Sequence, residues 1–312
     1  MITKITQIIL KSPMKLGYAC INQSLKCRSS NTFRLKNYSE ERLINIIDGN
    51  LSCLFKILEF NKLHHIFFFR ITSDLIPFAS HSIMNYNWQD HFKPVFKDLG
   101  KFVKLNKMRI TMHPGQYTVL NSVNPKVYNN SINELRYHVE VLDLMNLNSS
   151  AKVQIHIGGV YGDKEKSKKR FISRFEKLDD YIKKRVIIEN DDRSYTFKDC
   201  LSIHDAINIP IVFDVYHHEC NNNGEILKEC FNLFTNTWKK EDGLPIVHYS
   251  SEHPIKSKCS HTDTIDINHF KNFIKETRHY NFDIMLEIKD KEKSALKTLK
   301  VLANDQRLNK NN

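Results

Sequence analysis

The sequence has no long hydrophobic run, no C-x-x-C pair and no glycine-rich phosphate loop of the G-x-G-x-x-G type. Its longest apolar run, 66–69, is far shorter than the roughly 20 residues that a membrane-spanning helix needs. The short apolar stretch at the N-terminus is followed by no convincing cleavage site, so we do not expect a secretory signal peptide. Glycine and proline are few, at 9 and 8 residues, and no linker or low-complexity segment divides the chain. These absences predict a soluble, intracellular protein without a membrane segment.

The cysteines are scattered, and none of them forms a recognisable metal or redox motif. An odd number of dispersed cysteines, in a chain long enough to bury a large core, is typical of reduced thiols in a reducing compartment. We therefore expect seven free thiols, at Cys20, Cys27, Cys53, Cys200, Cys220, Cys230 and Cys259.

The charge is strongly unbalanced. Among 312 residues, 47 are Lys or Arg and 35 are Asp or Glu, which gives a net charge of +12 with histidine neutral. Hydrophobic residues make up 41% and charged residues 26%, a composition that excludes wholesale disorder. A basic surplus of this size predicts a polyanionic partner, either a nucleic acid or an acidic membrane surface.

Short apolar runs alternate with long amphipathic stretches along the chain. Continuous runs rich in Ile, Val and Phe are typical of strands that are buried on both faces of a parallel sheet. The apolar runs are 16–20, 66–71, 109–113, 153–157, 186–189, 211–215, 245–249 and 284–288. The stretches expected to be helical are 39–63, 90–105, 131–147, 166–184, 196–207, 225–238, 268–278 and 292–302.

Eight βα units in one undivided chain favour an α/β fold of the (β/α)8 TIM-barrel type over an open, doubly wound sheet. The missing G-x-G-x-x-G turn removes the main support for a dinucleotide-binding fold. We expect a single barrel domain over 15–305, preceded by a poorly ordered N-terminal extension, 1–14, and followed by a polar tail, 306–312.

The predicted strands end on residues that can bind metal ions. In such barrels the reactive side chains project from the C-terminal ends of the strands and from the loops that follow. Buried carboxylates gathered at one mouth are costly to desolvate, and divalent cations that take imidazole and carboxylate ligands remove that cost. We therefore predict a clustered site for two or three divalent ions, with ligands drawn from His81, His113, His156, Glu189, Asp214, His217, His248, His261 and Glu287.

Three features near these strand ends leave alternatives open. His218 is a metal ligand, a support for a ligand or a phosphate contact, and the sequence does not choose between them. Cys20 is expected to be a buried, inert thiol. The densest basic run, 164–170, is either a solvated helix face or a contact with DNA. Two or three neighbouring metal ions commonly support phosphodiester or phosphomonoester hydrolysis.

With these motifs in view, the chain resembles the UV damage endonucleases, TIM-barrel repair enzymes that nick DNA beside bulky photolesions. The resemblance covers about 15–293, and MHPGQY (112–117) and IPFASH (76–81) are its most specific segments. The other matching segments are LGYACIN (16–22), FRITSDL (69–75), NELRYHVEVLDL (133–144), IHIGGVYGDK (155–164), IIENDD (187–192), FDVYHH (213–218), VHYSSE (247–252) and LEIKDKE (286–292).

The resemblance implies the same nine metal ligands, with Glu189, Asp214, His248 and Glu287 as the catalytic residues. It implies that Gln116 and Tyr117 probe the DNA for a lesion and that Tyr18 and Asn22 lie near it. The cofactors it implies are two or three divalent ions, with Mn2+ expected first and Zn2+ or Mg2+ as alternatives. One position departs from the family, because Ile246 stands where the family carries a lysine that can be carboxylated and join the metal site.

The resemblance implies a metal-dependent DNA repair endonuclease. Such an enzyme incises the phosphodiester bond immediately 5′ to cyclobutane dimers and 6-4 photoproducts and leaves a 3′-hydroxyl and a 5′-phosphate. Its partner is double-stranded DNA that contains UV lesions, and no membrane or obligate protein partner is implied. The alternatives are an abasic-site endonuclease of the endonuclease IV type, a xylose-isomerase-like sugar enzyme and a lesion-binding protein that has lost its catalytic activity.

Overall fold

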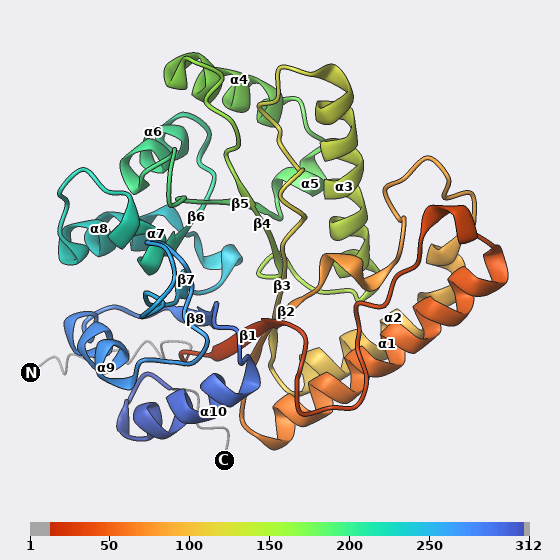
Figure 1. The fold of residues 1–312 in the computed structure, drawn as a ribbon, viewed down its shortest axis with the longest axis horizontal. Helices are drawn as coiled ribbons and strands as arrows, with labels where there is room; N and C mark the ends of the chain where they lie inside the picture. Colours follow the sequence, from red (N-terminus) through yellow and green to blue (C-terminus); the bar gives the residue numbers. More distant parts are fainter. Residues whose placement is uncertain (1–12, 309–312) are drawn as a thin grey trace, which may run out of the picture.

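Eight parallel strands close into a barrel, and helices surround it (Figure 1). This computed structural model describes residues 13–308. Each strand pairs with the next along the chain, and β8 pairs with β1, so the predicted (β/α)8 barrel is confirmed. The strands are β1 (Leu16–Cys20), β2 (Phe68–Ile71), β3 (Arg109–Met112), β4 (Lys152–His156), β5 (Val186–Glu189), β6 (Ile211–Asp214), β7 (Ile246–Tyr249) and β8 (Asp283–Leu286).

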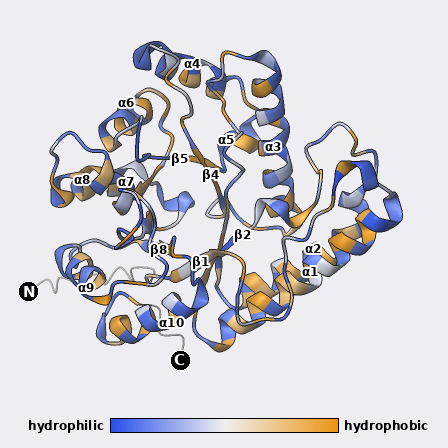
Figure 2. Cartoon of the chain, viewed as in Figure 1, coloured by the Kyte–Doolittle hydropathy of each residue, from blue (hydrophilic) through white to orange (hydrophobic). Residues whose placement is uncertain are grey.

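The helices follow the predicted order, with apolar and polar residues on the same helix (Figure 2). The stretch expected to be helical over 166–184 is two helices, and the helix expected from 131 begins at Pro125, where Asn124 caps it. The helices are α1 (Glu40–Leu63), α2 (Trp88–Leu105), α3 (Pro125–Leu144), α4 (Lys164–Glu176), α5 (Asp180–Lys183), α6 (Phe197–Ile207), α7 (Val215–Cys220), α8 (Leu227–Phe234), α9 (Ile267–Glu276) and α10 (Glu292–Val301).

The two ends of the described chain lie side by side. Met14 is fully buried and forms a parallel bridge with Leu308, and its backbone N–H donates to the carbonyl of Arg307 at 2.5 Å. Met14, at the end of the predicted extension, and Leu308, in the predicted tail, are thus next to each other in the structure. The rest of the predicted extension, 1–12, and of the tail, 309–312, lies outside the described residues.

The N-terminal end of the barrel is closed by paired charges. Nη1 of Arg109 on β3 lies 2.6 Å from a carboxylate oxygen of Asp283 on β8, and both side chains are buried. Nζ of Lys152 on β4 lies 2.5 Å from a carboxylate oxygen of Asp242. Because side chains alternate along each strand, His156 lies on the same face of β4 as Lys152, four residues toward the C-terminal end.

Four of the seven cysteines form disulfides, so our prediction of seven free thiols is wrong. Cys27 pairs with Cys53 and Cys220 pairs with Cys259, across 26 and 39 residues of sequence, while Cys20, Cys200 and Cys230 are free. Spacing along the chain misses these pairs because each joins a loop to a segment whose approach no local pattern shows. None of the helices in the described part of the chain is long and apolar enough to cross a membrane.

Candidate metal centre

Imidazoles and carboxylates from six strands meet at the C-terminal mouth of the barrel. Two groups have ligand atoms that all lie within 4.8 Å of one another. Glu189 at the end of β5 belongs to both groups and therefore lies between them. The first group is His113, His156 and Glu189, and the second is Glu189, Asp214, His248 and Glu287.

The backbone fixes the orientation of three of the histidines. Nδ1 of His113 lies 2.7 Å from the carbonyl oxygen of Pro114, Nδ1 of His217 lies 3.0 Å from that of Asn190, and Nδ1 of His261 lies 2.9 Å from that of Glu287. A ring that donates from Nδ1 to a carbonyl presents Nε2 with its lone pair free. Metal-binding histidines are usually held in this way.

Asp214 is positioned by the turn from β6 into α7. Its carboxylate caps α7 by accepting a hydrogen bond from the backbone N–H of His217 at 2.7 Å. Its backbone N–H donates to the side-chain oxygen of Asn190 at 2.9 Å, and the side-chain amide of Asn190 donates to the carbonyl of Asp214 at 3.0 Å. The ends of β5 and β6 are thereby tied together, with Glu189 and Asp214 both directed to the mouth.

The donor set of this mouth fits divalent metal ions. The buried polar atoms that have no hydrogen-bond partner among the described residues include Oδ2 of Asp214, Nε2 of His248 and Nδ1 of His156. Such groups are costly to bury unless they are paired or coordinate a metal. The acids at the N-terminal end of the barrel each have an Arg or Lys partner, whereas the mouth supplies one Arg for three carboxylates. Imidazole and carboxylate ligands suit Mn, Fe or Zn.

Glu189 and His248 form a buried ion pair, with Nδ1 of His248 2.7 Å from a carboxylate oxygen of Glu189. Burial by itself raises the pKa of Glu189, but the charges of His248 and His156 outweigh burial and bring the pKa below its ordinary value. Burial likewise lowers the pKa of His248, but Glu189 and Glu287 raise it to about 10. Without a metal ion, His248 therefore carries a proton at neutral pH.

The other histidines of the mouth divide into neutral and charged rings. Burial, together with the charges of Arg70 and His156, lowers the pKa of His113 to about 3, so this ring is neutral and ready to bind a cation. Burial also lowers the pKa of His217, but Asp214 and Glu189 raise it to about 9. Burial raises the pKa of Asp214 above its ordinary value.

His217 and His261 lie beside the two groups. The ring centroids of His156 and His217 are 5.8 Å apart, and those of His217 and His261 are 5.7 Å apart, so the imidazoles form a row along the mouth. His81 belongs to neither group: it is exposed, its Nδ1 accepts from the backbone N–H of Ile83 at 3.0 Å, and it lines a pocket of about 730 Å3 with Tyr117 and Glu134.

The four residues predicted to contact or lie near a lesion are not equivalent. Gln116 and Tyr117 are exposed in the β3–α3 loop, and the hydroxyl of Tyr117 donates to a carboxylate oxygen of Glu134 at 3.3 Å. Tyr18 and Asn22 are buried: the Tyr18 hydroxyl donates to Asn61 at 2.7 Å and accepts from the side-chain amide of Asn22 at 2.8 Å. In this structure Tyr18 and Asn22 anchor the β1–α1 loop and do not reach the surface of the mouth.

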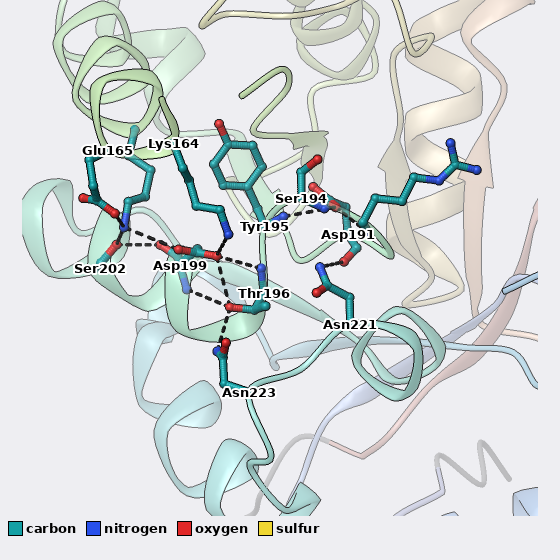
Figure 3. A network of polar contacts seen from close by, with 12 residues as sticks. Lys164, Glu165, Asp191, Ser194, Tyr195, Thr196, Asp199, Ser202, Asn221 and Asn223 are labelled. Atoms are coloured by element: carbon teal, nitrogen blue, oxygen red, sulfur yellow. Dashed lines mark hydrogen bonds and ion pairs between the residues drawn. The ribbon is translucent and has the colours of Figure 1, made fainter. Parts of the chain in front are cut away.

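The basic run at the start of α4 is largely neutralised by acids. Figure 3 shows Lys164 directed at Asp199, and their side-chain atoms lie 3.0 Å apart. Nζ of Lys168 lies 2.8 Å from Glu165 and 3.4 Å from Asp199. These contacts favour an intramolecular role for Lys164 and Lys168 over a direct contact with DNA.

The contacts of His218 favour a structural role over the roles of metal ligand and phosphate contact that the sequence also left open. Its Nε2 lies 3.1 Å from the carbonyl oxygen of Glu225 and 3.8 Å from the sulfur of Cys230, and its ring packs on Phe213. His218 thus joins α7 to α8 and lies in neither ligand group. Cys20 is half-buried in β1 and is free of any disulfide.

Two residues that the sequence reasoning did not single out contact the ligand groups. Nη1 of Arg70 lies 2.5 Å from a carboxylate oxygen of Glu287, and the side-chain amide of Gln154 donates to Glu189 at 3.4 Å. The alternation within β2 and β4 was the available signal. Arg70 and Gln154 each lie on the inward face of a strand otherwise rich in apolar residues.

Fold and site together define a class: a (β/α)8 barrel with a His and carboxylate cluster suited to several divalent ions at the C-terminal ends of its strands. The family model described as "UV-endonuclease UvdE" matches residues 14–312. The chain therefore belongs to the UvdE family of UV endonucleases, nucleic-acid-cleaving hydrolases that act in DNA repair.

Relatives and solved structures agree with this assignment. The UV DNA damage endonuclease of Clostridium perfringens is 44% identical over 291 residues, which are 93% of this chain and 71% of that protein. The enzyme of the same name from Bacillus mycoides is 35% identical and covers 85% of this chain and 84% of its own. The crystal structure of SacUVDE has a TM-score of 0.90 at 45% identity and covers 95% of this chain and all of that one.

More distant structures share the fold alone. Endonuclease IV from Thermus thermophilus has a TM-score of 0.56 at 12% identity and covers 93% of this chain and 98% of its own. A D-tagatose 3-epimerase-like protein has a TM-score of 0.58 at 17% identity. Endonuclease IV, one of the alternatives that the sequence left open, therefore shares the barrel fold with this chain.

Proposed function

We propose that this protein incises duplex DNA at the phosphodiester bond immediately 5′ to a UV photoproduct and leaves a 3′-hydroxyl and a 5′-phosphate. Cyclobutane dimers and 6-4 photoproducts are the proposed lesions. The proposal is supported by the family and by the arrangement of Glu189 within 4.8 Å of the other ligand atoms in both groups. One carboxylate between two ligand groups is the arrangement that a pair of neighbouring ions requires.

The proposed cofactors are two or three divalent ions, with Mn2+ favoured and Zn2+ or Mg2+ as alternatives. Bound ions of this kind supply an activated water and stabilise the departing 3′ oxygen. In this chain the proposed ligands of one ion are Glu189, Asp214, His248 and Glu287. The proposed ligands of a neighbouring ion are His113 and His156, together with Glu189. His217 and His261 are the ligands proposed for the outer edge, and His81 is a ninth ligand whose loop must move inward on binding.

The proposed lesion sensor is the exposed pair Gln116 and Tyr117. A crosslinked dinucleotide stacks poorly and costs less to extrude from the duplex than normal bases do. An aromatic ring with an amide beside it fills the space left in the helix. The Tyr117 ring lies against Gly115, where an added Cβ would approach it to 2.4 Å, so a larger residue at this position would displace the Tyr117 side chain.

A nicking assay tests the proposal. The purified protein with added Mn2+ is given the same oligonucleotide in three forms: undamaged, UV-irradiated or carrying one abasic site. The proposal expects cleavage of the irradiated duplex at the bond 5′ to the lesion, and weaker cleavage as salt rises, because DNA contacts release counterions. Efficient cleavage of the abasic duplex alone would overturn it in favour of an endonuclease IV-type activity, and lesion binding without cleavage would favour the non-catalytic alternative.

A further inference from the structure

The disulfide between Cys220 and Cys259 joins helix α7, which carries His217, to the loop that carries His261. Cys220 is the last residue of α7 and lies three residues after His217. Cys259 lies two residues before His261, in the loop between β7 and α9. The two histidine rings are 5.7 Å apart, so the covalent link lies beside the imidazole pair proposed to hold an ion at the outer edge of the site.

The α7 side of this link is firmly held by other contacts. The side-chain amide of Asn221 donates to the carbonyl of Asp191 at 3.0 Å, and that of Asn223 donates to the hydroxyl of Thr196 at 3.1 Å. Figure 3 shows both amides directed at the loop between β5 and α6. With Asp214 capping its first turn, α7 is fixed at both ends without the disulfide.

The β7–α9 loop contacts the segment after β8 on the side that follows His261, where the backbone N–H of Asp290 donates to the carbonyl of Asp263 at 3.0 Å and Nζ of Lys289 lies 2.8 Å from the carboxylate of Asp263. It is braced internally, for example by the backbone N–H of His253, which donates to the carbonyl of Ser260 at 2.9 Å. Its contacts with the mouth include the hydroxyl of Tyr216, which donates to the carbonyl of Ser260 at 3.2 Å, and the bond from Nδ1 of His261 to Glu287. Its tip is open to solvent, and Ile255 is 89% exposed. The disulfide is the covalent link between α7 and this loop, and it lies on the side of the loop that precedes His261.

We propose that Cys220 and Cys259 are positioning residues whose disulfide holds His261 against His217, so that the redox state of this pair sets the affinity of the outer metal position. The inference rests on the proposed function, because it takes His217 and His261 as metal ligands. Both cysteines are half-buried, which leaves them within reach of small thiols and disulfides. A disulfide that forms and breaks in response to its surroundings is characteristic of redox-sensing proteins in reducing compartments.

The chemistry is thiol–disulfide exchange with a low-molecular-weight disulfide. One cysteine thiolate attacks that disulfide and forms a mixed disulfide, and the second cysteine then displaces the remaining small thiol. Two S–H bonds of the protein and one external S–S bond are replaced by the Cys220–Cys259 bond and two small thiols. Two electrons pass from the protein sulfurs to the external pair, so atoms and charges balance.

The experiment measures Mn2+ binding to the full chain in two redox states. The metal-free protein is equilibrated with oxidised or reduced glutathione, its cysteine pairing is mapped by mass spectrometry, and free Mn2+ is followed by electron paramagnetic resonance during titration. We expect the oxidised form to bind the weakest Mn2+ equivalent about 10-fold more tightly than the reduced form, the size of effect seen when a group that orients a ligand is lost. The other equivalents should change little.

The chain supplies its own matched control. Cys27→Ala/Cys53→Ala removes the other disulfide, which joins the β1–α1 loop to α1, and should keep the redox effect on Mn2+ binding. Cys220→Ala/Cys259→Ala should bind Mn2+ like the reduced protein, with no further response to glutathione. If that variant does not fold, the inference is tested with the Cys27→Ala/Cys53→Ala protein alone, by comparing its Mn2+ affinity in oxidised and in reduced glutathione.

Two results overturn the inference by itself: Cys220 and Cys259 unpaired after oxidation, or equal Mn2+ affinity in the two redox states with the disulfide mapped. If neither the oxidised nor the reduced form binds Mn2+, the proposed metal site is overturned, and this inference with it. The two failures are distinguishable because cysteine pairing is measured independently of the metal.

Discussion

Arg70 and Glu287 form an ion pair inside the barrel mouth, with 2.5 Å between Nη1 and the carboxylate oxygen and side-chain exposures of 9% and 17%. Burial by itself raises the pKa of Glu287, but Arg70 and His248 outweigh it and bring the pKa well below its ordinary value. Arg70 thus holds Glu287 ionised in the position from which it can bind a metal ion. At the other end of the same barrel, Arg109 and Asp283 form a pair with no metal-ligand group beside it.

Arg70→Met should therefore destabilise the protein mainly when no metal is bound. Removing one partner of a buried ion pair costs about 3 kcal/mol or more. His248, 3.1 Å from Glu287, offsets part of that loss, and a bound cation replaces the missing charge. Thermal unfolding with and without Mn2+ should show a large loss in the metal-free form and a smaller loss in the loaded form. Arg109→Met is the control, and its loss should be the same in both forms. Equal losses for Arg70→Met in the two forms would remove Glu287 from the metal site.

Glu189→Gln should reduce metal binding at both ligand groups at once. The amide keeps the size of the side chain but removes the charge shared by the groups, so nicking and Mn2+ affinity should each fall by more than about 100-fold. Elemental analysis after desalting and a nicking assay provide the measurements. Asp283→Asn, which changes a buried acid at the N-terminal end, should lower stability and leave the metal content intact. Full metal content in Glu189→Gln would contradict the shared-ligand assignment.

Metal affinity should increase with pH. His217 and His248 have pKa values raised to about 9 and about 10, so both rings are protonated at pH 7 in the metal-free protein. A metal ion binds only the neutral imidazole and must displace these protons, which gives up to about a tenfold gain in affinity per pH unit for each proton released. Calorimetry in buffers of different ionisation enthalpy counts the protons. An affinity that is constant between pH 6 and 8 would be incompatible with protonated His217 and His248.

Tyr117→Ala should weaken binding to a UV-damaged duplex more than binding to an undamaged one. Loss of one base–aromatic stack costs about 1–3 kcal/mol, or about 5- to 150-fold in affinity. Tyr117→Phe keeps the ring, loses the hydrogen bond to Glu134 and should have a smaller effect. Tyr181→Ala is the control, because Tyr181 is similarly exposed but lies in α5, before β5 begins. Equal losses on both duplexes would assign Tyr117 to general DNA contact.

Arg193→Gln should lower DNA affinity and the salt dependence of binding. The Arg193 side chain lies on the β5–α6 loop, four residues after Glu189. It is 86% exposed, although its Nε lies 3.3 Å from a carboxylate oxygen of Asp192. Removal of one phosphate contact should reduce the slope of log affinity against log salt by about 1. Lys164→Gln should leave the slope unchanged, because Asp199 already pairs with Lys164. A larger change of this slope for Lys164→Gln than for Arg193→Gln would indicate that the basic run at the start of α4 contacts DNA.

The sequence by itself determined the barrel, because apolar runs of strand length alternating with amphipathic stretches are satisfied by a closed parallel sheet surrounded by helices. It also predicted that residues of several strand ends meet at one candidate site, since the ends of parallel strands converge whatever their separation along the chain. Glu189 and Glu287 are almost a hundred residues apart and share one ligand group.

Only the tertiary structure decided which side chains reach that site and which other side chains hold them in position. His218 adjoins the proposed ligand His217 in sequence and yet contacts Glu225 and Cys230, and Tyr18 is buried against Asn61 and Asn22. The pairing of Cys220 with Cys259, and of Arg70 with Glu287, depends on loops and strands whose approach no local pattern encodes. The physical reason is that periodicity fixes the face on which a side chain lies, whereas its partner is set by the closure of the whole barrel.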